Sequence, residues 1–107
     1  FMQTPYARIG MTEAEARQTG RQIAVKEMPA AVIPRLHVDG KLTGLLRAIV
    51  DTDTQEILGA ALLCQNAHEV INIIKTAVDN QLPYTVLRDQ IFTHPTVSES
   101  LNDLFAI

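Results

Sequence analysis

The sequence predicts an α+β domain: an antiparallel β-sheet meander with helices packed on one face, in two layers. Short apolar segments joined by short turns fill the middle of the chain, which favours antiparallel pairing. The expected order is one helix, several strands and then several helices. The 107 residues suffice for one domain with its own core and are too few for two, so we treat residues 1–107 as a single unit.

The expected strands occupy the middle of the chain. Apolar side chains alternate with smaller or polar ones in residues 22–28. Residues 44–51 and 56–64 are nearly continuous apolar runs, which is typical of strands in the middle of a sheet. A hairpin turn is predicted at Asp39-Gly40, because glycine tolerates the positive φ of a type I′ turn.

The first helix is predicted over residues 13–19 by a capping box. The side chain of Thr12 can accept from the backbone N–H of Glu15, and the Glu15 carboxylate can reach back to the backbone of Thr12. Gly20 supplies a stop signal after the last helical residue.

The clearest periodic segment predicts an amphipathic helix that begins at Asn66 and ends near Asn80. Asn66 and Glu69 form a second capping pattern. Five apolar residues follow at the spacing of one helical face: Val70, Ile73, Ile74, Ala77 and Val78.

Two shorter helices are expected at the end of the chain. One lies within residues 85–92. The other is opened by Thr96 and Glu99, a third capping pattern, and its apolar stripe is Leu101, Leu104 and Phe105. Pro95 disfavours helical backbone at His94, so an extended segment separates the two helices.

Composition excludes several classes of function. A net charge of −3 argues against a nucleic-acid-binding surface or a surface for anionic membranes. No apolar run approaches the ~18 residues of a membrane-spanning helix. The first residues also lack the order of a signal peptide, so we expect a cytoplasmic protein. The single cysteine, Cys64, excludes an intrachain disulfide and a Cys-rich zinc site.

His94 is the main candidate for chemistry. Histidine exchanges protons near neutral pH, and a carboxylate can orient the ring and stabilise the imidazolium. Pro95 forces an extended backbone that can project the His94 ring away from the helices, and Glu99 could fold back towards it. The alternative is that Glu99 only caps the last helix and His94 is an ordinary loop residue, because such pairs are common by chance.

Three other residues are weaker candidates. We expect His37 at the surface of a strand, and His68 on the first turn of a helix without partners for a metal. Cys64 is expected to be a buried thiol without an activating cation. No metal site is therefore expected, and a free-standing metal or ligand sensor built from these residues is the least favoured hypothesis.

The segment around the candidate histidine resembles the C-terminal signature of the pyridine nucleotide-disulfide oxidoreductases: His94-Pro95-Thr96-x-x-Glu99. The resemblance covers essentially the whole chain. Residues 4–13 are similar to the start of that family's dimerisation domain, and residues 44–60 are similar to its central hairpin. Residues 87–105 look closest to a bacterial branch near mercuric reductase that is linked with resistance to reactive chlorine and related oxidants.

This resemblance implies the C-terminal dimerisation domain of a longer flavoenzyme, with FAD and NAD(P) domains upstream in the same chain and two chains in a homodimer. His94 would act as acid/base at the disulfide and flavin of the partner subunit, and Glu99 would orient it. His94 and Pro95 would line the partner's FAD. FAD and NAD(P)H would serve the full-length enzyme, whereas this chain alone is expected to bind neither and to be inactive.

A second hypothesis stays open beside the first. The domain would then be a purely structural homodimerisation module of a flavoprotein reductase. The electron acceptor of that reductase, a metal ion or a quinone, would need no proton from His94.

Overall fold

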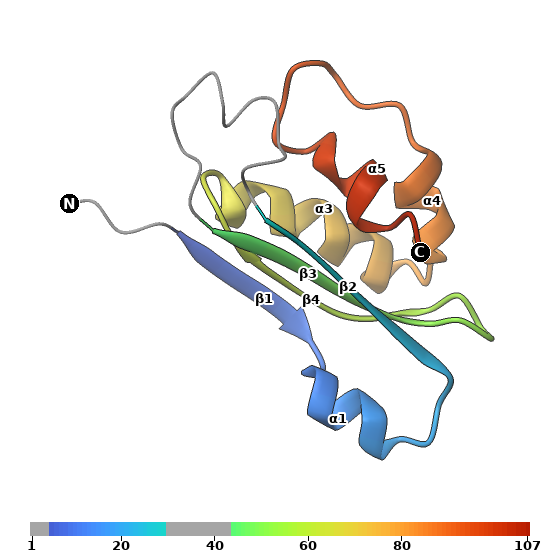
Figure 1. Cartoon of the computed structure of the whole chain (residues 1–107). Coiled ribbons are helices and arrows are strands. Elements are labelled where there is room, and N and C mark those ends of the chain that lie inside the picture. Colours follow the sequence, from blue (N-terminus) through green and yellow to red (C-terminus); the bar gives the residue numbers. More distant parts are fainter. Residues whose placement is uncertain (1–4, 30–43) are drawn as a thin grey trace.

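The computed structural model describes residues 5–29 and 44–107. Within these ranges it confirms the α+β class, with helices stacked on an antiparallel sheet (Figure 1). The elements in chain order are β1 (Tyr6–Gly10), α1 (Glu13–Gln18), β2 (Ile23–Pro29), β3 (Leu45–Asp51), β4 (Ile57–Leu63), α3 (Ala67–Asp79), α4 (Tyr84–Asp89) and α5 (Ser100–Leu104). The turn predicted at Asp39-Gly40 lies outside the described residues. No helix in the described part of the chain is long and apolar enough to cross a membrane.

The sheet has the strand order β1-β4-β3-β2, and all neighbouring strands are antiparallel. Strands β2, β3 and β4 form the predicted meander. Strand β1 was missed, because the sequence analysis expected a helix as the first element. Ala7 and Ile9 pack against the core while Tyr6 and Arg8 are exposed, and a five-residue segment of this kind is stabilised only by pairing with β4.

A close approach of two backbones sets the end of β1. Gly10 and Gly59 are cross-strand partners, and Gly10 has a φ of 70°. A Cβ atom on Gly59 would lie 2.0 Å from the carbonyl oxygen of Met11, so only glycine leaves enough room. The N–H of Met11 donates to the carbonyl of Leu58 at 2.9 Å, and the chain then leaves the sheet for α1.

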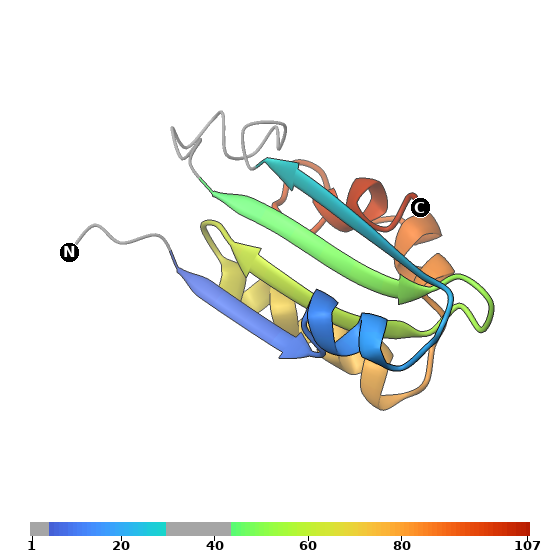
Figure 2. The ribbon, with the colours of Figure 1, turned by 60° about the horizontal axis from the view of Figure 1, so that its bottom comes forward.

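The main core lies between one face of the sheet and the helices α3, α4 and α5. Its largest fully buried side chains include Phe105, Leu46, Leu62, Ile74, Leu101 and Leu104. Helix α1 packs on the opposite face, where Ala16 forms a small second core with Ile49 and Leu58. Figure 2 shows α1 in front of the sheet and α3 behind it. The prediction of helices on one face therefore holds for α3, α4 and α5, and α1 adds a short cover on the other face.

Helix α3 confirms the clearest periodic prediction, with two local differences. Val70 and Ile74 are buried as expected, but Ile71 is buried too, whereas Val78 is 36% exposed. The capping pattern predicted at Asn66 is wrong, since Asn66 makes no side-chain cap bond. Asn66 has a left-handed backbone with a φ of 66°. In this conformation its side-chain oxygen does not accept a hydrogen bond from the first turn of α3, as a capping side chain would.

The ends of α1 and α4 follow the sequence prediction to different degrees. The capping box of α1 is present, with N–H to oxygen distances of 3.2 Å from Glu15 to Thr12 and 2.9 Å from Thr12 to Glu15. Helix α4 ends at Asp89, three residues before the predicted limit, because Gln90 has an extended backbone with ψ 143°. Residues 90–93 therefore carry no regular structure and lead directly to His94.

Candidate acid/base site

The carboxylate of Glu99 folds back onto the imidazole of His94. The Nδ1 atom of His94 lies 2.8 Å from Oε1 and 2.9 Å from Oε2 of Glu99. The His94 side chain is 71% exposed, whereas that of Glu99 is only 22% exposed. The geometry therefore pairs an accessible ring with a sheltered carboxylate.

A reciprocal capping box between Thr96 and Glu99 holds the carboxylate in place, but α5 begins only at Ser100, so the box closes the turn before the helix and does not open the helix as predicted. The N–H of Thr96 donates to Oε2 of Glu99 at 2.7 Å, and the N–H of Glu99 donates to the Thr96 hydroxyl at 3.3 Å. That hydroxyl in turn donates to the carbonyl of Thr93 at 2.7 Å. The capping interpretation and the acid/base interpretation are therefore compatible, because one carboxylate serves both the turn before α5 and the imidazole.

Helix α5 gives the pair a buried support. Leu101 and Leu104 of α5 lie in the main core, as does Val97 in the turn before the helix, two residues after the exposed cis His94-Pro95 peptide. At the other end of α5, the ammonium of Lys26 on β2 donates to the carbonyl of Asp103. Helix α5 is therefore attached to the sheet at its C-terminal end through Lys26, and its apolar side chains pack into the main core.

The charge state of the pair follows from these contacts. The hydrogen bond with His94, and then the bond from the N–H of Thr96, lower the pKa of the Glu99 carboxyl below its usual value. Glu99 is therefore ionised at neutral pH and acts as the acceptor. This assigns the shared hydrogen to Nδ1 of His94 and leaves Nε2 as the ring atom that can exchange a proton with another group.

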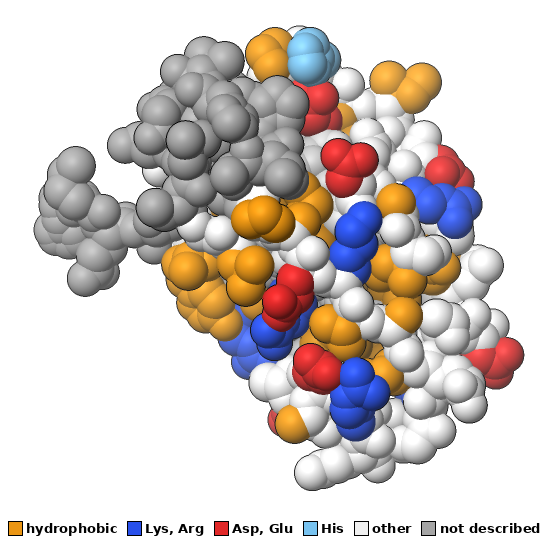
Figure 3. Space-filling view, viewed as in Figure 1, with side chains coloured by type: hydrophobic (Ala, Val, Ile, Leu, Met, Phe, Trp, Pro, Cys, Tyr) orange, Lys and Arg blue, Asp and Glu red, His pale blue; other side chains and the backbone are white. Residues whose placement is uncertain are grey.

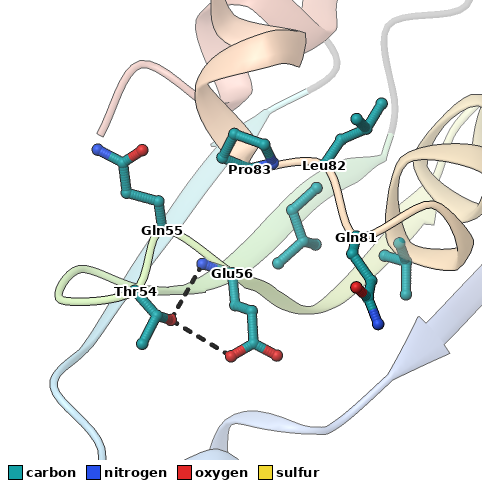
Figure 4. A pocket seen from close by; sticks show the side chains of 8 residues that line it. Thr54, Gln55, Glu56, Gln81, Leu82 and Pro83 are labelled. Carbon is teal, nitrogen blue, oxygen red and sulfur yellow. Dashed lines mark hydrogen bonds between the residues drawn. The ribbon is translucent and has the colours of Figure 1, made fainter.

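At least four grooves lie on the described surface. One of about 400 Å³ borders the candidate pair and is lined by Asn66, Glu69, Val70, Pro95, Thr96, Val97 and Ser98. Another of about 560 Å³ lies between the β3–β4 turn and the α3–α4 connection, as Figure 4 shows. Its lining contains none of the candidate catalytic or metal-binding residues predicted from the sequence. The Thr54 hydroxyl donates to the Glu56 carboxylate within it at 3.3 Å.

The weaker candidates do not gather at the site. Cys64 is fully buried, and this burial raises the pKa of its thiol to about 11, so it is a core side chain rather than a nucleophile. His68 is exposed on the first turn of α3, and His37 lies outside the described residues. Within residues 5–29 and 44–107, no group of three His, Cys, Asp or Glu side chains could hold a metal ion.

Comparison with known proteins decides the family. Residues 1–105 match the model of the pyridine nucleotide-disulphide oxidoreductase dimerisation domain. The chain belongs to this family. This confirms the resemblance that the sequence analysis found in the segment from His94 to Glu99 and along the rest of the chain.

Relatives of this dimerisation domain include several named reductases. It is 56% identical over its full length to the probable pyridine nucleotide-disulfide oxidoreductase RclA of Escherichia coli K12, covering 24% of that protein. It is 30% identical over 101 residues to a mercuric reductase of Staphylococcus aureus, covering 94% of this chain and 18% of that protein. The chain thus spans about a quarter or less of the length of these relatives.

Solved structures agree with this assignment. The HOCl-induced flavoprotein disulfide reductase RclA from Escherichia coli superposes with a TM-score of 0.94 at 56% identity, over 97% of this chain and 24% of that one. LpdA from Mycobacterium tuberculosis superposes with a TM-score of 0.86 at 18% identity, which shows a shared fold. The chain therefore has the fold of the corresponding quarter of that flavoprotein disulfide reductase, and its similarity to a HOCl-induced relative agrees with the branch resemblance noted in the sequence.

Proposed function

We propose that this dimerisation domain supplies His94 and Glu99 as an acid/base pair to the redox disulfide and flavin of a partner subunit. The full-length protein would be an FAD-dependent, NAD(P)H-linked disulfide oxidoreductase that works as a homodimer. The observation that carries the proposal is the exposed imidazole whose Nδ1 is held by a sheltered, ionised carboxylate. The family membership and the 56% identity to a flavoprotein disulfide reductase support the same assignment.

The disulfide that this pair would serve must come from outside residues 1–107. The single cysteine in this range, Cys64, is fully buried in the main core, so these residues cannot form a disulfide beside His94 among themselves. His94 and Pro95 are both exposed, and this is the surface a flavin ring from another subunit would need. Bound FAD would pass electrons from NAD(P)H to the disulfide. The chain alone would be inactive, because it would lack both the disulfide and the flavin.

The proposed proton transfer uses the free side of the imidazole. Reduction of a disulfide by two electrons breaks the S–S bond and yields two thiolates, each of which needs a proton to become a thiol. The imidazolium of His94 would donate the proton on Nε2 to one thiolate, while Nδ1–H stays bonded to Glu99. In the reverse direction Nε2 would accept a thiol proton, and Glu99 would stabilise the imidazolium that forms.

A surface for assembly lies on the opposite face of the sheet. Tyr6, Leu63 and Leu45 are cross-strand neighbours on β1, β4 and β3, with exposed fractions of 52%, 38% and 38%. Figure 3 shows hydrophobic side chains beside basic ones over β1. Because monomeric proteins rarely leave such rows open, we propose that the full-length homodimer buries this surface.

The purely structural hypothesis remains the second candidate. Mercuric reductases are among the relatives, and one solved structure of RclA from Escherichia coli is a Cu(II) complex. If a metal ion is the acceptor of the full-length protein, the acceptor needs no proton from His94, and the domain would contribute assembly alone.

One experiment separates the two candidates. In the full-length flavoenzyme, His94→Ala should cut disulfide-coupled turnover by about 10²-fold or more while flavin reduction by NAD(P)H stays largely intact. His68→Ala is the matched control, because the His68 side chain is also exposed but, unlike that of His94, makes no hydrogen bond to Glu99 in the described structure. Unchanged turnover in His94→Ala would leave only the structural role.

A further inference from the structure

The side chain of Asn102 lies at the junction between α5 and the segment that carries His94. Its Nδ2 atom is 2.9 Å from the carbonyl oxygen of Leu87, 3.1 Å from that of Arg88 and 2.8 Å from that of Gln90. The residue is half-buried. One amide group therefore faces three backbone carbonyls from a segment 12 to 15 residues earlier in the chain.

These carbonyls need a donor because α4 stops abruptly. The last helical N–H bond runs from Gln90 to the carbonyl of Val86 at 2.9 Å, and Gln90 then turns extended. The carbonyls that follow Val86 would be bonded by the next N–H groups if the helix continued, and they lose those donors when it ends. The two N–H bonds of a primary amide, shared among three acceptors, replace them.

The position of Asn102 links this junction to the candidate site. Glu99 and Asn102 are three residues apart at the start of α5, so the same short segment presents one carboxylate and one amide. The carboxylate contacts His94, and the amide contacts Gln90, four residues before His94. Between Gln90 and His94, Ile91 is 95% exposed, whereas Phe92 is partly buried and packs against the main core as a further contact of this segment.

We propose that Asn102 is a positioning residue that sets the distance between the His94 ring and the Glu99 carboxylate. The Asn102 amide fixes the start of the segment at Gln90, and the Thr96 capping box fixes its end. With both ends attached to the same turn of α5, His94 can reach Glu99 only over a narrow range of positions. The inference rests on the proposed function, because it assigns to Asn102 an effect on that same pair.

A purely structural role for Asn102 makes a different prediction. A helix-capping amide would stabilise α4 without affecting the reaction at His94. Asn80 offers a matched control, because its Nδ2 donates to the carbonyl of Thr76 at 2.7 Å at the end of α3. Asn80 shares the chemistry of Asn102 but contacts neither the segment before His94 nor α5.

The test is a double-mutant cycle in the full-length flavoenzyme. Asn102→Ala alone should lower disulfide-coupled kcat about tenfold, because small displacements of a positioned catalytic group have large effects on rate. In the His94→Ala background the same substitution should cause no further loss, because residues that act through one group are non-additive. Asn80→Ala should leave turnover within about twofold of the unsubstituted enzyme.

The outcomes separate this inference from the proposed function. An equal loss from Asn102→Ala in both backgrounds, or no loss in either, would overturn the positioning role while His94 keeps its own. No effect of His94→Ala by itself would overturn the proposed function and this inference with it. If Asn102→Ala does not yield folded, flavin-bound dimer, Asn102→Ser serves the same cycle, because its shorter side chain has a single donor and places no negative charge against the three carbonyl oxygens.

Discussion

The Nδ1 atom of His94 lies 2.8 Å from one carboxylate oxygen of Glu99 and 2.9 Å from the other, next to the start of α5. One of these oxygens also accepts the N–H of Thr96 at 2.7 Å. Glu99 thus binds a backbone donor that cannot move independently of α5 and a ring that is exposed to other molecules. Any change at Glu99 should therefore affect both the local turn and the proposed proton transfer.

We expect Glu99→Gln in the full-length flavoenzyme to lower disulfide-coupled turnover about tenfold, part of the ~10²–10⁴-fold that general acid–base catalysis contributes. The amide keeps the size of the side chain but loses the charge that stabilises the imidazolium. Steady-state kcat with a disulfide acceptor and stopped-flow flavin reduction by NAD(P)H measure the two half-reactions. Glu13→Gln on α1 is the control, since Glu13 pairs only with Arg17 in the described structure. Equal losses in the two variants would argue against a special role for Glu99.

The lowered pKa of Glu99 predicts a pH dependence of stability. Its contribution is fully present above the unfolded-state pKa of about 4.3 and is lost as the pH falls through the lower pKa of the folded state. Urea midpoints of the native domain should therefore fall more steeply below about pH 4.3 than those of Glu99→Gln. Asp51, Glu15 and Asp89 also have lowered pKa values, so the difference between the two proteins isolates Glu99. Parallel curves would contradict the prediction.

Gly59→Ala should destabilise the domain by about 3 kcal/mol, at the upper end of the cost of overpacking. The new Cβ atom would lie 2.0 Å from the carbonyl oxygen of Met11, and backbone atoms cannot move aside as a side-chain end can. The comparison is Gly20→Ala, where nothing lies within 4 Å and the cost is the strain of a positive φ, about 1 kcal/mol. Urea unfolding measures both. A smaller loss at Gly59 than at Gly20 would show that β1 and β4 can separate at little cost.

The Cys64 thiol should resist modification in the native protein. Burial raises its pKa to about 11, so the reactive thiolate is scarce at neutral pH, and no part of the side chain is exposed. At pH 8, an aromatic disulfide reagent should react with Cys64 in the folded protein about 10²-fold more slowly than with Cys64 in the protein unfolded by denaturant. Rapid reaction of the folded domain would show that β4 opens readily near the start of α3.

Local sequence signals were reliable where a pattern depends on neighbouring residues. The Thr12 and Glu15 capping box and the apolar face of α3 are formed largely as predicted. Asn66 shows the limit of such signals, because its capping pattern is as good as that of Thr12. The choice between a side-chain cap and a left-handed backbone depends on how the chain enters the helix from β4.

Strand β1 and the role proposed for Asn102 could not be predicted from local patterns. The strand is stabilised by cross-strand partners 49 to 57 residues away, from Gly59 for Gly10 to Leu63 for Tyr6. Asn102 meets the carbonyls of Leu87 and Gln90 only because α4 and α5 pack together. In the sequence, Asn102 is an ordinary polar residue of a short helix.

The sequence by itself determined the α+β class, the family and the spacing that allows His94 to meet Glu99, because each depends on residue types at fixed separations. Burial of Cys64 and exposure of the His94 ring were also expected from the sequence, and the structure confirms both. The tertiary structure alone decided that the Glu99 carboxylate is sheltered and that the Asn102 amide meets the end of α4. These contacts depend on how distant segments pack, and no local pattern contains that information.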